Sequence, residues 1–164
     1  MFHIRDAVLD DVPAIARVHM QSDWHTYSPL FGSEAYALQP DETELRWRRA
    51  LGDGDTLLVA CDSGEIVGFG HARGERIGAL YLLGSHQRRG MGSALLSGLL
   101  TILKKRGVAE ARFDVVAKNA NAIAFYRSRG AYPVGRCINH DARGDTEDLI
   151  FAIPTGSATE QPSA

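Results

Sequence analysis

The segment from Leu80 to Leu96 joins an apolar strand directly to an amphipathic helix through a loop with two glycines, Gln87-Arg88-Arg89-Gly90-Met91-Gly92. A helix start leaves backbone N–H groups without intrahelical partners, and these groups lie at the positive end of the helix dipole. Gly90 and Gly92 have no Cβ atom, so an anion can approach those amides closely. The segment therefore predicts a strand–loop–helix unit, and a diphosphate is a suitable ligand for it.

This loop differs from two other phosphate-binding loops. It lacks the Gly-Lys-Ser/Thr ending of a nucleoside-triphosphate P-loop, and it lacks the full GxGxxG of a dinucleotide-binding fold. Taken alone, its two glycines and basic pair are explained better by an ordinary tight turn. The phosphate interpretation depends on a second motif further along the chain.

The second motif is Asn119-x-x-Ala122-x-x-Phe125-Tyr126-x-x-x-Gly130. Asn119 can cap a short helix, and Ala122 is small enough to let a ligand pass. Tyr126 is one residue around the helix from Phe125, so the two rings can face different sides.

Together the two motifs resemble the Q/R-x-x-G-x-G/A loop and the N-x-x-A-x-x-F/L-Y-x-x-x-G-F helix of the GCN5-related N-acetyltransferase (GNAT) family. The resemblance covers about Thr56 to Ile153; Ala131 replaces the common phenylalanine, and Gly84 stands where proline is frequent. It implies an N-acetyltransferase that moves an acetyl group from acetyl-CoA to a primary amine by direct attack in a ternary complex, without a metal. A non-catalytic acyl-CoA-binding sensor or module is the alternative, and a longer acyl chain is left open.

The resemblance also implies roles for individual residues. Tyr126 is expected to act as the general acid that protonates the departing sulfur or donates a hydrogen bond to it. The remaining coenzyme-binding candidates are the backbone of Tyr81, Leu82 and Leu83 beside the pantetheine arm, the motif residue Gln87, the pyrophosphate-loop residues Arg88, Arg89, Gly90, Met91, Gly92 and Ser93, and the helix residues Asn119 and Ala122.

The general base is less defined, because direct attack needs a neutral amine and most amines are protonated at pH 7. Many family members carry a glutamate on the strand before the loop, but residues 76–80 contain no acid. Glu75 and His71 are therefore tentative bases of equal rank. Asp114 is a further candidate, and a chain of water molecules to solvent is an alternative to all of them.

The acceptor is a small-molecule or peptide amine in this interpretation, and the sequence does not identify it. One expected wall of its pocket is a loop with Tyr27, Phe31 and Tyr36; the other is the polar loop 140–145. Acidic residues in the polar loop favour a cationic amine, although ordinary hairpin chemistry explains them equally well.

Hydrophobic periodicity and turn residues predict an α+β (mixed α/β) fold: a central, mostly antiparallel mixed sheet of about six to seven strands, flanked by about four helices. One acetyltransferase domain is expected over residues 1–154, with a disordered tail over 155–164. Strands are expected at 3–7, 56–61, 66–72, 79–83, 112–116, 132–138 and 148–153. Helices are expected from Asp10/Asp11 onward, at 41–51 with Leu45, Trp47 and Leu51 as anchors, at 92–106 and at 119–129.

The composition restricts the partners. A net charge of −2 and a pI of about 6.3 do not suit a nucleic-acid binder, and no apolar stretch is long enough to span a bilayer. With no signal peptide visible, a cytoplasmic protein is expected. Cys61 and Cys137 are interpreted as small buried hydrophobic residues, with a disulfide left open, and a homodimer is also left open.

Overall fold

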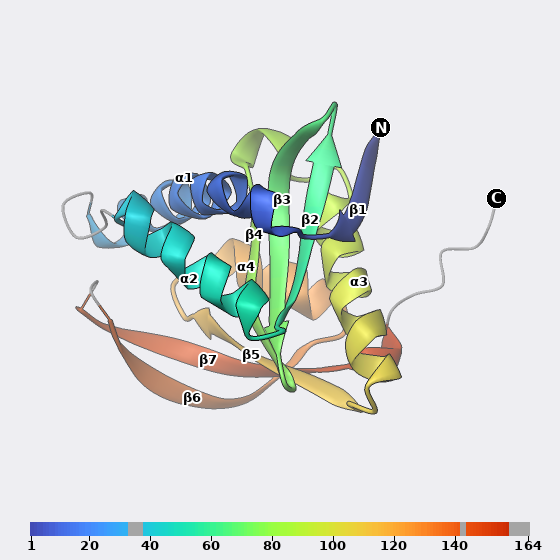
Figure 1. Ribbon diagram of the computed structural model, residues 1–164. Helices are drawn as coiled ribbons and strands as arrows, with labels where there is room; N and C mark the ends of the chain where they lie inside the picture. Colours follow the sequence, from blue (N-terminus) through green and yellow to red (C-terminus); the bar gives the residue numbers. More distant parts are fainter. Residues whose placement is uncertain (33–37, 142–143, 158–164) are drawn as a thin grey trace.

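One seven-stranded sheet organises the chain in the computed structural model, which describes residues 1–32, 38–141 and 144–157 (Figure 1). The strand order is β1-β2-β3-β4-β5-β7-β6, and all neighbours are antiparallel except β4 and β5. The strands are β1 (Phe2–Asp6), β2 (Thr56–Asp62), β3 (Glu65–Arg73), β4 (Arg76–Leu82), β5 (Glu110–Val116), β6 (Tyr132–Asp141) and β7 (Gly144–Pro154). The predicted mixed, mostly antiparallel sheet is confirmed.

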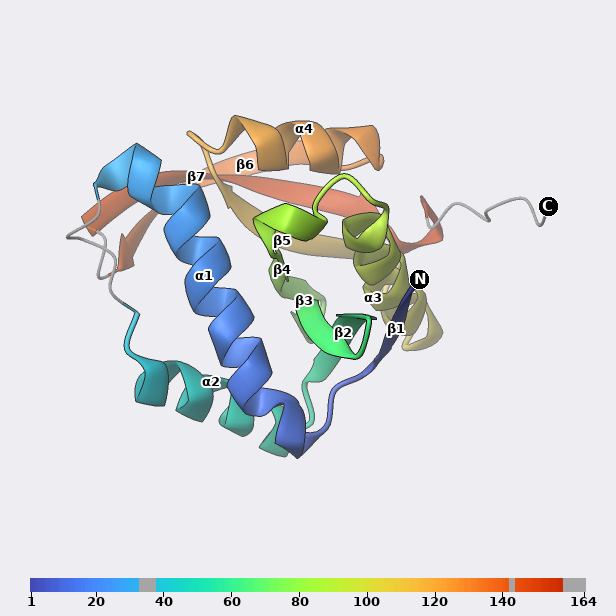
Figure 2. The ribbon, with the colours of Figure 1, turned by 90° about the horizontal axis from the view of Figure 1, so that it is seen from above.

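Helices cover both faces of this sheet (Figure 2). They are α1 (Val12–Phe31), α2 (Pro40–Gly52), α3 (Met91–Lys105) and α4 (Ala120–Ser128). Figure 2 shows α1 and α2 on one side of β2 to β4 and α3 on the other, while α4 lies over the β5–β7–β6 half. Two hydrophobic clusters fill the layers. One cluster contains Trp47 of α2 and Phe69 of β3, and the other contains Leu95 and Leu99 of α3 with Phe113 of β5.

His19 of α1 is buried against the sheet and has a structural partner there. The Trp47 indole Nε1 donates a hydrogen bond to His19 Nδ1 over 3.2 Å, and the two rings meet edge to face. A histidine that is only 4% exposed and accepts such a bond is a packed core residue.

Strands β4 and β5 separate soon after they meet. Among the described residues they share one register pair, Arg76 with Arg112, although each strand has seven residues. Beyond that pair, the edge of β4 that faces β5 has no neighbouring strand to receive its backbone hydrogen bonds. Unpaired strand edges accept extended ligands, so this divergence positions the candidate site.

Four expectations about the elements were wrong in detail. The expected loop at Tyr27 is instead the end of α1, which runs to Phe31 with Pro29 inside it. Tyr36 lies outside the described residues. Leu45 is 45% exposed, so among the expected α2 anchors only Trp47 is fully buried.

The expected polar loop over 140–145 is mostly strand. β6 continues to Asp141 and β7 begins at Gly144, with cross-strand pairs such as Arg136–Glu147 at 2.7 Å. The tail prediction was wrong for Thr155–Ser157, a short 3-10 helix whose buried Thr155 hydroxyl donates to the Val108 carbonyl over 2.8 Å. Residues 158–164 lie outside the described part of the chain.

Cys61 is buried and Cys137 is half-buried, and both thiols are free. The interpretation as a buried hydrophobic residue is confirmed for Cys61. In the part of the chain that the structure describes, no helix is both long and apolar enough to cross a membrane.

The start of α1 is held by an ion pair. Arg5 donates to both carboxylate oxygens of Asp11 over 2.7 and 2.9 Å, and the Val8 amide donates to Asp11 over 2.8 Å. Asp11 is the N-cap residue of α1, but its side chain makes no cap hydrogen bond to the helix and accepts bonds from residues before it. The hydrogen bonds from Arg5, supported by the Val8 amide, lower the pKa of Asp11 below its ordinary value of 3.8 despite desolvation.

Asp11→Asn is expected to reduce the free energy of unfolding at pH 7 by about 1–2 kcal/mol, because it removes charge-assisted bonds. A carboxyl whose pKa is lowered by folding contributes stability above its unfolded pKa and loses it as the pH falls through the folded value. The gap to wild type should therefore close in acid below pH 3.8. Urea denaturation across pH tests this, with the exposed neighbour Asp10→Asn as control; a gap that is constant with pH would contradict it.

Candidate functional site

The loop between β4 and α3 has the backbone geometry that its glycines predict. Gly90 is the N-cap residue of α3 with φ +84°, a left-handed conformation that favours glycine, and Arg88 has φ +61°. Nothing lies within 4 Å of the position that a Cβ of Gly90 would take. The amides of Met91, Gly92 and Ser93 open the helix, so they have no intrahelical acceptor. The first turn of α3 therefore has amides without intrahelical acceptors, and the space beside Gly90 is open.

The side chains of the loop have more definite positions than the sequence suggests. The Gln87 amide donates to the Leu82 carbonyl over 3.3 Å, which ties the loop to the end of β4. Met91 is fully buried. Gly92 faces α4, because its Cβ would lie 3.7 Å from the Phe125 ring. Arg88 is exposed, whereas Arg89 is paired with Asp62.

The end of β4 carries Tyr81, Leu82 and Leu83. The Leu83 amide donates to the Val67 carbonyl of β3 over 2.9 Å, so the β3 side of this segment is satisfied. The Tyr81 hydroxyl donates to Asp23 of α1 over 3.2 Å. Burial raises the pKa of Tyr81 well above 10.0, and nearby Tyr27 and Asp23 raise it further. The backbone that faces β5 is the part available to a ligand.

Tyr126 is a residue of α4, and its ring packs on Phe113 of β5. Asn119 caps α4 as predicted, since its side-chain oxygen accepts from the Ala122 amide over 3.1 Å. The Tyr126 ring is 9% exposed and lies 4.3 Å from the Phe113 ring, centroid to centroid. Burial raises the pKa of Tyr126 above its ordinary 10.0, and Tyr27 of α1 adds to the shift. Tyr126 therefore stays protonated at neutral pH.

The candidate bases occupy different environments. Glu75 is exposed in the turn between β3 and β4. This turn lies at the opposite end of β4 from the loop between β4 and α3, which is called the Gly90 loop from here on. His71 of β3 is buried, with Nε2 2.7 Å from Asp55 Oδ2. Asp114 of β5 is ion-paired with Arg76 at 2.8 Å.

His71 has one ring nitrogen in use and one without a partner. Asp55 accepts hydrogen bonds, so Nε2 carries the proton in the neutral ring and Nδ1 presents a lone pair. Within the described ranges, Nδ1 is buried and has no hydrogen-bond partner. A Cβ on Gly78 would lie 2.4 Å from Nδ1, so the ring fits only because β4 has glycine there.

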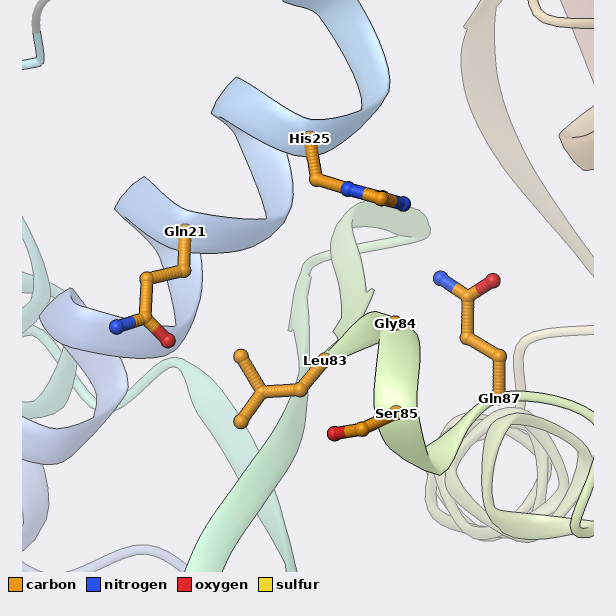
Figure 3. A pocket seen from close by; sticks show the side chains of 6 residues that line it. All are labelled: Gln21, His25, Leu83, Gly84, Ser85 and Gln87. Carbon is orange, nitrogen blue, oxygen red and sulfur yellow. The ribbon is translucent and has the colours of Figure 1, made fainter.

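A cavity of about 460 Å³ opens between α1 and the Gly90 loop (Figure 3). It is lined by Gln21, His25, Leu83, Gly84, Ser85 and Gln87. Figure 3 shows the His25 and Gln87 side chains extending from α1 and the loop toward the same space. Sequence reasoning identified Leu83 and Gln87 but missed Gln21 and His25, whose i, i+4 spacing on one helix face was the available signal.

The expected acceptor walls are only partly assembled. Tyr27 lies close enough to Tyr81 and Tyr126 to raise the pKa of both, and Phe31 lies under the Lys118 ammonium at 5.3 Å. The end of α1 thus meets the start of the α4 motif. The segment 140–145 is a hairpin of β6 and β7, with residues 142–143 outside the described residues. Asp23, 4% exposed beneath Tyr81, is an acidic group that sequence reasoning missed.

Among residues 1–32, 38–141 and 144–157, no cluster of three or more histidine, cysteine, aspartate or glutamate side chains is arranged to hold a metal ion.

Comparison with known proteins gives three consistent findings. Residues 19–131 match the Acetyltransferase (GNAT) family. The chain is 32% identical to mycothiol acetyltransferase of Amycolatopsis mediterranei over 73% of its own length and 42% of that protein, and 53% identical to the ribosomal protein bS18-alanine N-acetyltransferase of Escherichia coli over 42% and 48%. It thus spans less than half of these two relatives.

Among solved structures, the PaiA N-acetyltransferase of Thermoplasma acidophilum, in complex with coenzyme A, superimposes with a TM-score of 0.73 at 21% identity. The match covers 94% of this chain and 99% of that one. This likeness shows that the fold is shared.

Proposed function

The chain belongs to the GNAT acetyltransferase family, and from this we propose that it transfers an acetyl group from acetyl-CoA to an amine. The observation that carries the proposal is the open amide group at the start of α3 next to the unpaired edge of β4. We further propose that a single acetyltransferase domain spans residues 1–157, since Thr155 is bonded to the segment before β5.

Acetyl-CoA would supply an activated acetyl thioester. The amides of residues 91–93, the Arg88 side chain and the half-exposed Arg89 would hold its diphosphate, because oriented N–H groups and guanidinium groups bind such an anion. The free edge of Tyr81 and Leu82 would pair with the amides of the pantetheine arm. Asn119 and Ala122 would border that arm from α4.

Tyr126 would act at the sulfur. Its raised pKa keeps the phenol protonated, so the O–H can donate to the charge that develops as the thioester breaks. Burial beside Phe113 fixes the ring and lowers the local dielectric, which strengthens that hydrogen bond.

His71 is the better of the two tentative bases. Its free Nδ1 lies against Gly78 on the β4 segment that has left β5, and Asp55 fixes the tautomer that presents the lone pair. Glu75 lies at the opposite end of the strand. Asp114 stays a second candidate, with its charge partly engaged by Arg76.

His71→Gln is expected to lower kcat/KM for the amine about tenfold near pH 7, because a lost base leaves proton removal to water. Glu75→Gln should stay within about twofold of wild type. Steady-state rates across pH test both, with coenzyme A affinity as the control for folding of the site. Equal losses in the two variants, or a loss only in Asp114→Asn, would remove His71 from the role.

Two observations restrict the class of amine that we propose as the acceptor. A relative is named for an alanine of ribosomal protein bS18, and the buried carboxylate of Asp23 beside Tyr81 favours a cationic group. We therefore propose a small-molecule or peptide amine that carries a positive charge beside the reacting nitrogen.

The experiment that tests the function is a thiol-release assay with acetyl-CoA across peptides with free N-termini, amino acids, polyamines and thiol-linked amino sugars. Turnover on one class supports the proposal and names the acceptor. Coenzyme A binding with no turnover on any class would favour a non-catalytic acyl-CoA sensor, and no binding at all would end both interpretations.

A further inference from the structure

Asp62, at the end of β2, holds a position that the reaction itself does not explain. Its side chain is 9% exposed and lies near the Arg89 guanidinium, the His86 ring and the Met1 amine. Its Oδ2 is 3.1 Å from Arg89 Nη2 and 3.6 Å from His86 Nε2, while Oδ1 is 3.8 Å from the Met1 amine. A buried carboxylate is costly unless it is paired, so these contacts are what stabilise it.

Two of its partners belong to the loop between β4 and α3. His86 ends the 3-10 turn after β4, and Arg89 directly precedes Gly90. Arg88, between them, has φ +61°, a conformation that is unfavourable for a residue with a Cβ. Such a loop needs outside contacts to keep its shape, and Asp62 contacts it on both sides of Arg88.

We propose that Asp62 is a positioning residue for the diphosphate of the coenzyme, an inference that rests on the proposed function. It anchors His86 and Arg89 to the β2–β3 hairpin, so that the loop keeps the strained shape that exposes the α3 amides. Arg89 is 51% exposed and uses one terminal nitrogen for Asp62, which leaves its other N–H groups for phosphate oxygens.

The anchoring outweighs the repulsion that a carboxylate exerts on a phosphate. Asp62 is paired, and its charge is largely neutralised by Arg89 where it stands. Without it, the Arg89 side chain would have to be ordered when the coenzyme binds, and that entropy would reduce the affinity.

Asp62→Asn is expected to raise KM for acetyl-CoA about tenfold and leave kcat within about twofold, as loss of one charge-assisted anchor predicts. The same variant should be unchanged in kcat/KM with S-acetylpantetheine, a donor that lacks the diphosphate. Asp62→Glu should recover part of the affinity. The matched control is Glu65→Gln, which removes the same charge from the exposed residue directly opposite Asp62 in the hairpin.

Arg89→Gln keeps the test decisive if Asp62→Asn folds poorly. Arg89→Gln should weaken coenzyme A binding, measured by calorimetry, and adding Asp62→Asn to it should cost less than in wild type. Unchanged or tighter coenzyme binding in Asp62→Asn, or an equal loss with the short donor, would overturn the positioning role. If wild type neither binds coenzyme A nor uses either donor, the proposed function itself fails.

Discussion

Tyr126→Phe is expected to lower kcat about 100-fold, at the lower end of what a lost general acid costs, while coenzyme A binds with unchanged affinity. The substitution removes one hydroxyl and keeps the ring that packs on Phe113 at 4.3 Å, so the fold should be preserved. A steady-state thiol-release assay gives kcat, and calorimetry gives the dissociation constant for coenzyme A. A rate within about threefold of wild type would exclude Tyr126 from the chemistry.

The matched control is Tyr132→Phe on β6. The Tyr132 side chain is exposed and its hydroxyl donates to Glu110, so removing that hydroxyl should leave kcat unchanged. The pH profile adds a second check. Because burial raises the pKa of Tyr126, the wild-type rate should not fall as the pH approaches 10.0, the ordinary value at which an exposed phenol loses its proton.

Local sequence features predicted much of this fold because each one acts within a few residues. Gly90 can adopt φ +84° without strain, Asn119 can reach the Ala122 amide, and alternating apolar residues choose a buried strand face. Those signals gave the strands, α3, α4 and the loop between β4 and α3.

The remaining features depend on contacts between distant residues. Asp62 meets Arg89 across 27 positions only because β2, β3 and β4 are neighbours, and Asp23 meets Tyr81 because α1 crosses β4. Neither pair has a spacing that marks it. The helix end at Tyr27, which was expected to be a loop, likewise meets a distant segment, since the Lys118 ammonium lies over the Phe31 ring.

The general base also could not be chosen from local sequence alone. Glu75 and His71 were equal candidates along the chain because both lie close to the strand that precedes the Gly90 loop. The β3–β4 register shifts directly after the His71–Ala79 pair, and the His71 ring lies against Gly78. Asp55, which contacts the same ring, lies in the connection between α2 and β2. Only the folded sheet shows that His71 is a buried histidine bonded to Asp55, whereas Glu75 lies in a solvent-exposed turn.

Gly90→Ala is expected to weaken coenzyme A binding about 100-fold, which corresponds to the loss of two hydrogen bonds to a charged group at about 1.5 kcal/mol each. A methyl group at Gly90 would enter the open space in front of the α3 amides, where nothing now lies within 4 Å. It would also favour a negative φ, which would turn the first amides away from their common direction.

The same chain offers a control for the strain alone. Gly107, just beyond the other end of α3, has the same φ of +84° and the same empty surroundings. Gly107→Ala and Gly90→Ala should therefore lose similar unfolding free energy in urea, about 1 kcal/mol each. Only Gly90→Ala should lose coenzyme affinity. If calorimetry shows equal affinity in both variants, the start of α3 does not hold the diphosphate, because the two positions differ in little except which end of the helix dipole they occupy.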